Sequence, residues 1–207
     1  MKTTRGLVFL LYCTHFFTGL ADTPINAWIK PGSGDWQDQT AWSLGVLPAP
    51  NQTIMLTNQG WKAIAIGPST APNFSGSLDV SSVILGGYTD SFNLLLLNYA
   101  GFEVPLTTGN LLVGTNSGVT VLASVLSVST NSGTGDLTIE SRFNQGASAN
   151  VSAKTMHVGT SNAPGVYNLT NGNLSVTITD GLYSGSKTAI ATDTNLAGTA
   201  PPLQSGN

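Results

Sequence analysis

Gly-Asn-Leu-Leu-Val-Gly-Thr at residues 109–115 and Met-His-Val-Gly-Thr at residues 156–160 begin two similar stretches of this chain. Each is followed by a polar turn, a short alternating segment and a Leu-Ser-Val ending, at 126–128 in the first copy and 174–176 in the second. Imperfect repetition of short strands and turns is typical of a stacked array of structural repeats. The region from Gly109 to Ile178 therefore decides the predicted fold.

Short apolar segments separated by Gly, Asn and Ser recur on both sides of these copies, at intervals of roughly nine residues. Two architectures fit this spacing. One is a right-handed parallel β-helix (β-solenoid) with about 20–25 residues and three short strands per turn. The other is a β-sandwich built from hairpins. The self-similarity and the scarcity of Asn-Gly and Asp-Gly hairpin turns favour the β-helix, although Asn171-Gly172 and Asp180-Gly181 are such dipeptides.

Composition supports an all-β protein. Charged residues make up 8% of the chain, far below the ~25% usual for globular domains. Ser, Thr, Asn and Gly supply the polarity instead, and these residues suit turns and strands better than helices. One continuous apolar run, Leu94 to Leu97, has the length of a strand buried on both faces.

The N-terminus has the features of a secretory signal peptide over residues 1–21. Lys2 and Arg5 precede an apolar run that is too short to span a membrane, and small residues lie near Ala21. We therefore expect a secreted or cell-surface protein, cleaved near Ala21. The single cysteine, Cys13, lies in this leader, so the mature chain is expected to lack disulfides and cysteine-ligated metals.

The charge balance argues against several classes of partner. Without the leader, five Lys and Arg residues remain against ten carboxylates, a formal charge of −5. Nucleic acids and anionic membranes are bound by clustered cations, so neither is expected as a partner. No integral membrane span is predicted in the mature chain, and the remaining candidates are extracellular polysaccharide and cell-surface components.

Residues 22–72 differ from the repeats that follow. All four tryptophans lie in this segment, and large rings can cover the open end of a repeat array. We predict an N-terminal cap over 22–72, solenoid repeats over 73–179, and a weak or truncated final turn over 180–207. Exposed, coplanar rings at Trp36 and Trp42 would instead indicate a sugar-binding face.

The segment Ser33-Gly34-Asp35-Trp36, then Trp42-Ser43 and Gly-Val-Leu-Pro-Ala-Pro at 45–50, resembles the opening of certain secreted bacterial surface proteins. In that group the opening precedes a right-handed parallel β-helix passenger with autotransporter-like repeats. The resemblance covers most of residues 28–178. It implies the same fold and a bacterial cell-surface setting.

Asp136, Glu140 and Arg142, with Lys154, form the strongest candidate for catalysis. Glu140 and Arg142 are two apart on a predicted strand and are therefore expected on one face. Together with the other two they would supply the carboxylates and cations that a polysaccharide lyase needs. The alternative is a surface ion pair, which is common and weak.

Three other motifs are weaker. Gly181 to Thr188 approaches a phosphate-binding loop but has Ser186 where glycine is needed, so no nucleotide is expected. Gly133 to Asp136 resembles one copy of a calcium-binding repeat, and a hydrogen-bonded turn is the favoured interpretation. His157 is the only histidine outside the leader, which excludes sites of several histidines.

We assign no catalytic, cofactor-binding or metal-binding residue from the sequence. The leading hypothesis is a non-enzymatic, structural or adhesive β-helix module of a bacterial surface or secreted protein. A polysaccharide lyase or other carbohydrate-active enzyme on the same fold, and a carbohydrate-binding β-sandwich, are the alternatives.

Overall fold

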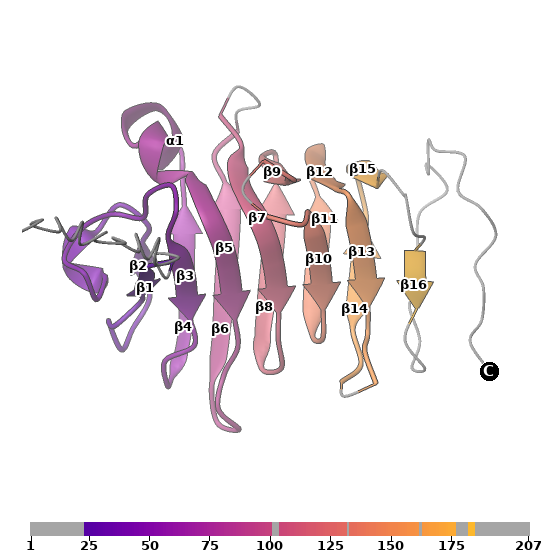
Figure 1. Cartoon of the computed structure of the whole chain (residues 1–207), viewed down its shortest axis with the longest axis horizontal. Coiled ribbons are helices and arrows are strands. Elements are labelled where there is room, and N and C mark those ends of the chain that lie inside the picture. Colours follow the sequence, from indigo (N-terminus) through magenta and orange to yellow (C-terminus); the bar gives the residue numbers. More distant parts are fainter. Residues whose placement is uncertain (1–22, 101–103, 132, 162, 177–181, 185–207) are drawn as a thin grey trace, which may run out of the picture.

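The chain forms a parallel β-helix of about six turns (Figure 1). The structure, a computed structural model, describes residues 23–100, 104–131, 133–161 and 163–176, and the backbone of 182–184. The predicted signal peptide, and all of the predicted tail except Leu182–Ser184, lie outside the described residues.

Two parallel sheets build the helix. The first has the path β1 (Ile25–Ala27), β3 (Thr53–Leu56), β5 (Asp79–Leu85), β7 (Leu106–Val113), β10 (Asp136–Ile139), β13 (Thr155–Val158) and β16 (Leu182–Ser184), with β9 (Val125–Val128), β12 (Ala149–Ala153) and β15 (Gly172–Val176) joined beside it. The second runs β2 (Gly34–Asp35), β4 (Trp61–Ile66), β6 (Phe92–Asn98), β8 (Ser117–Leu122), β11 (Arg142–Gly146) and β14 (Val166–Leu169).

Every pairing between two named strands in the described chain is parallel. The β-helix is thereby confirmed. The alternative of a hairpin-linked β-sandwich is wrong, because a sandwich of that kind needs antiparallel neighbours.

The register explains the repeat seen in the sequence. Leu111 pairs with Leu137, which pairs with Met156, so the two similar stretches lie two turns apart along the helix. In the second sheet Val119 pairs with Phe143, 24 residues later. Ile64 and Leu95 are 31 residues apart, because the helix α1 (Thr70–Asn73) and the 3-10 turn η2 (Ser75–Ser77) lengthen that turn.

Alternate side chains of each strand point into a continuous core. In the second sheet, one inward row stacks from turn to turn and consists of Ile64, Leu95, Val119, Phe143 and Tyr167, all buried. The last two rings are stacked with centroids 5.0 Å apart and planes 14° apart. Burying such a side chain contributes roughly 1.5–3 kcal/mol, so the stacked rows account for much of the stability of the solenoid.

The run Leu94 to Leu97 is a strand, but its predicted burial on both faces is wrong. Leu95 and Leu97 are fully buried in the core, whereas Leu94 and Leu96 lie half-buried on the outer surface of β6. Their neighbours in register are residues of the same sheet, and no second layer of the described chain covers this face.

A cluster of tryptophans closes the N-terminal end of the core. Trp28, Trp36 and Trp42 are buried, and Trp42 makes edge-to-face contacts with both of the others at 5.2 and 5.0 Å. The indole N–H of Trp36 donates to the carbonyl and hydroxyl oxygens of Ser77, both at 3.2 Å. The segment predicted as a cap also supplies strands β3 and β4 to the two sheets, and its boundary at residue 72 remains a prediction.

Candidate functional site

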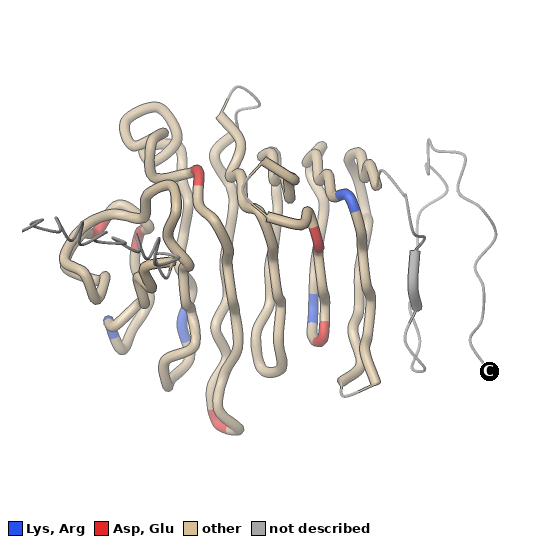
Figure 2. The backbone as a smooth tube through the Cα atoms, viewed as in Figure 1, with Lys and Arg blue, Asp and Glu red and all other residues tan. Residues whose placement is uncertain are grey.

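The charged residues proposed as a catalytic group do not gather at one place: Asp136 and Lys154 lie on neighbouring turns beside Gly135, whereas Glu140 and Arg142 lie at the other end of β10. Asp136 begins β10, whereas Glu140 follows the end of this strand and Arg142 begins β11. Glu140 and Arg142 therefore flank a corner, and the prediction that they share one face of one strand is wrong. No ion pair joins them in the described part of the chain, where charged positions are scattered along the tube (Figure 2).

Each carboxylate instead accepts a hydrogen bond from a hydroxyl group. The hydroxyl of Thr160 donates to Glu140 at 2.7 Å, and that of Thr134 donates to Asp136. Lys154 follows β12, and its backbone N–H donates to Gly135 at 3.0 Å. The contacts of Glu140 and Lys154 join neighbouring turns of the helix, whereas that of Asp136 lies within one turn.

The other motifs also occupy structural positions. Asn110 Oδ1 accepts a hydrogen bond from the backbone N–H of Thr134 at 3.2 Å and lies 2.7 Å from its hydroxyl oxygen, so the calcium-like motif is a hydrogen-bonded turn. His157 is half-buried on the outer side of β13 and pairs in register with Thr138. Among the described residues no group of three His, Cys, Asp or Glu could hold a metal ion. The phosphate-loop-like segment lies outside the described residues except for the backbone of β16.

The tryptophans divide into two sets. Trp36 and Trp42 are buried with planes 75° apart, so the exposed, coplanar pair that would indicate a sugar-binding face is not present at these two positions. Trp61, by contrast, is 74% exposed. It begins β4 and stacks on Phe92 at the start of β6, with centroids 5.8 Å and planes 24° apart.

The alternation of β4 explains why Trp61 points outward. Ile64 and Ile66 point into the core, so Lys62 also points inward and Trp61, Ala63 and Ala65 point outward. Assigning all four tryptophans to one cap overlooked this division. The period-two pattern of Trp-Lys-Ala-Ile-Ala-Ile at 61–66 was the signal that could have found it.

Lys62 occupies an inward position, and no carboxylate of the described residues pairs with it. It is 5% exposed, and its ammonium donates to the backbone oxygens of Asn58 and Gln59, at 2.9 and 2.7 Å, and to Asn93 Oδ1 at 3.0 Å. Burial lowers the pKa of Lys62. The ammonium thus holds the turn between β3 and β4 from within.

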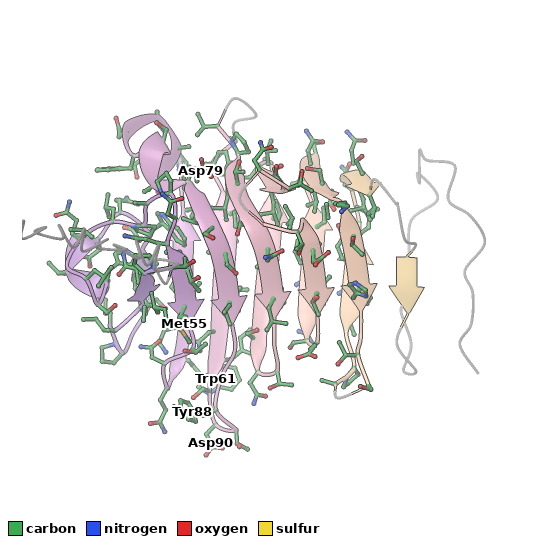
Figure 3. All side chains as sticks on the ribbon, in the orientation of Figure 1. Met55, Trp61, Asp79, Tyr88 and Asp90 are labelled. Atoms are coloured by element: carbon green, nitrogen blue, oxygen red, sulfur yellow. The ribbon has the colours of Figure 1, made fainter. Side chains whose placement is uncertain are left out.

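One loop carries further exposed groups beside the aromatic pair. Tyr88, 64% exposed, and Asp90 lie on the loop between β5 and β6, at the same end of the molecule as Trp61 (Figure 3). This loop is tied to the preceding turn, because the backbone N–H of Gly60 donates to Ser91 Oγ at 2.9 Å and that of Phe92 donates to the Gly60 oxygen at 3.2 Å. We call Trp61, Tyr88, Asp90 and Phe92 the aromatic corner.

A shallow depression of about 250 Å³ lies farther along the same sheet. It is lined by Leu122, Asn144, Gln145, Gly146, Asn168 and Thr170. The amide of Asn168 donates to Asn144 at 2.8 Å, and the lining contains no ionisable side chain. Its uncharged polar groups suit binding of water or a hydroxyl group, whereas proton transfer needs a titratable group.

Comparison with models of known protein families, with curated proteins and with solved structures finds no match to this chain. The helices of the described residues are too short and too polar to cross a membrane.

Proposed function

We propose that the chain is a non-enzymatic, structural or adhesive module of a secreted or cell-surface bacterial protein. The observation that carries this proposal is the use of the outward polar side chains. They hydrogen-bond to one another from turn to turn, as in Asn168 to Asn144 at 2.8 Å and Asn173 to Asn150 at 3.0 Å. Side chains engaged in such ladders stabilise the solenoid itself.

The shape of the solenoid supports the same assignment. Stacked repeats produce long, regular faces that suit extended contact with a partner. The extracellular setting is supported by the basic and apolar leader and by the low content of charged residues. The resemblance of residues 33–50 to the opening of bacterial surface proteins agrees with it.

The test has two parts. The whole coding sequence is expressed in a non-adherent bacterium, and the exported protein is located by cell fractionation and N-terminal sequencing. We expect secreted or surface-bound protein beginning near Asp22, and increased attachment of the cells to polysaccharide-coated surfaces. Protein retained in the cytoplasm with an intact leader would contradict the proposal.

The second part addresses catalysis directly. Purified protein is incubated with neutral and anionic polysaccharides, with and without calcium, and reducing ends and unsaturated products are measured. We expect no release. Cleavage that is lost in the double variant Asp136→Asn, Glu140→Gln would replace the structural assignment with a carbohydrate-active enzyme.

A further inference from the structure

The aromatic corner presents a large ring to solvent in a fixed orientation. Trp61 is the most exposed of the large hydrophobic residues in the described chain, at 74%. Its stacking on Phe92, with planes 24° apart, occupies one face of the indole. The high exposure of the residue means that the opposite face is open to a ligand.

The position of Phe92 is also constrained from its other side. A Cβ atom placed on Gly118 of β8 would lie 3.1 Å from the Phe92 ring, so the ring occupies the space that the missing side chain leaves. Gly118, Phe92 and Trp61 thus form a supported series across three neighbouring strands. Because the ring is already oriented, less conformational entropy is lost when a ligand stacks on it.

The sheet surface beside this ring carries small and apolar outward side chains. The next outward pairs in register are Ala63 with Leu94 and Ala65 with Leu96, all half-buried. The nearest lysine in sequence, Lys62, points inward and is bound by oxygens of the turn. Outside the sheet, the loop adds the exposed phenol of Tyr88 and the carboxylate of Asp90.

We propose that the aromatic corner binds a neutral, β-linked polysaccharide, with Trp61 stacked on the apolar C–H face of a pyranose ring. Aromatic rings combine a large apolar area with an electron-rich face, which suits the C–H groups of a sugar. Tyr88 and Asp90 supply a phenol and a carboxylate for hydrogen bonds to hydroxyl groups. This inference rests on the proposed adhesive function and names its ligand.

Charge decides between neutral and anionic glycans. The chain has a formal net charge of −3, and the aromatic corner contains a carboxylate and no cation. An anionic polysaccharide would be repelled by Asp90 and would find no Lys or Arg of the corner with which to pair. A neutral glycan with equatorial hydroxyl groups has no charge for Asp90 to repel and needs no cation to pair with.

The experiment measures binding of the full-length exported protein to microcrystalline cellulose, to chitin and to alginate. We expect binding to cellulose or chitin and none to alginate. Trp61→Ala should weaken the binding at least about tenfold, and Trp61→Phe should retain part of it. Phe74→Ala is the matched control, because Phe74 is an aromatic residue 37% exposed and lies outside the corner.

Circular dichroism of each variant establishes that it is folded, and light scattering gives its mass. Unchanged binding by Trp61→Ala, or no binding of the wild type to either neutral polymer, would overturn the proposal. A wild-type dimer that Trp61→Ala converts to a monomer would also overturn it, because a second copy would then be the occupant. A further outcome is that cells expressing the protein still attach to polysaccharide-coated surfaces while the purified protein binds neither neutral polymer. In that case the proposed ligand is wrong and the adhesive function stands.

Discussion

The phenol of Tyr167 donates a hydrogen bond to the side-chain oxygen of Gln145 inside the solenoid, one turn away along the chain. The amide nitrogen of Gln145 donates in turn to the backbone oxygens of Ala149 and Asn173, both at 2.9 Å. Tyr167 is 5% exposed and Gln145 is 1% exposed. This network links β11 and β14 to the two strands that follow them, β12 and β15.

Tyr167→Phe is expected to destabilise the fold at neutral pH. The change keeps the ring stacked on Phe143 but leaves the buried Gln145 oxygen without its donor, which costs about 1–3 kcal/mol. The urea denaturation midpoint, measured at pH 7, checks this. Tyr88→Phe is the control, because Tyr88 is 64% exposed, and its midpoint should equal that of the wild type. Equal midpoints for both variants would contradict the role of the network.

Alkaline pH should destabilise the wild type through the same residue. Burial raises the pKa of Tyr167, so the folded chain keeps the phenolic proton at a pH above about 10, where the unfolded chain loses it. The stability that this group contributes is complete below that pH and declines as the pH rises further. The usual tyrosine pKa is about 10, and measurements at about pH 9 and pH 11 lie on either side of it. Between these two pH values the denaturation midpoint of the wild type should therefore fall more than that of Tyr167→Phe. Identical decreases would contradict this assignment.

Lys62→Met is expected to destabilise the first described turns. The change keeps an unbranched side chain but leaves three backbone oxygens and Asn93 Oδ1 without their charged donor. Hydrogen bonds to charged groups contribute about 1.5–3 kcal/mol. Lys30→Met provides the comparison, because Lys30 is exposed and pairs with Asp38 at 3.3 Å, and such a pair is worth roughly 0–1 kcal/mol. Thermal melting of both variants measures the difference, and a Lys30 effect as large as the Lys62 effect would refute it.

Trp36→Ala tests the closure of the core. Trp36 is fully buried among Trp42 and Ser77, so its removal should cost about 3–5 kcal/mol. Trp61→Ala removes an exposed ring and one stacking contact, for which we expect less than about 1.5 kcal/mol. Tryptophan fluorescence follows unfolding in urea, and a comparable loss in the two variants would show that Trp36 does not close the core.

Gly165→Ala tests the tight approach of neighbouring turns. An added Cβ would lie 2.0 Å from the backbone oxygen of Ile139, a distance that requires the backbone to move. Overpacking of this kind costs typically about 1–3 kcal/mol. Gly76→Ala is the control, because an added Cβ there meets nothing within 4 Å. Circular dichroism during thermal unfolding should separate the two variants, and equal melting temperatures would argue against the close approach.

The sequence by itself determined short strands whose alternate side chains point inward, and the self-similarity of the Leu-Leu-Val and Leu-Ser-Val segments favoured a β-helix over a β-sandwich. The parallel pairing that excludes the sandwich came from the tertiary structure. The sequence also determined that tryptophans gather at the N-terminal end. It did not place the corner at Glu140 and Ser141, which ends β10 and separates Asp136 from Arg142 at the start of β11. Nor did it place Trp61 on the outer face while Trp28, Trp36 and Trp42 enter the core.

The difference between these two sets of features has a physical reason. The direction of a side chain along one strand follows from local geometry, whereas its neighbours come from other turns, roughly 20–30 residues away in a stacked array. Local patterns therefore define the strands and their inward faces. Only tertiary stacking decides which outward groups meet, and with them the aromatic corner.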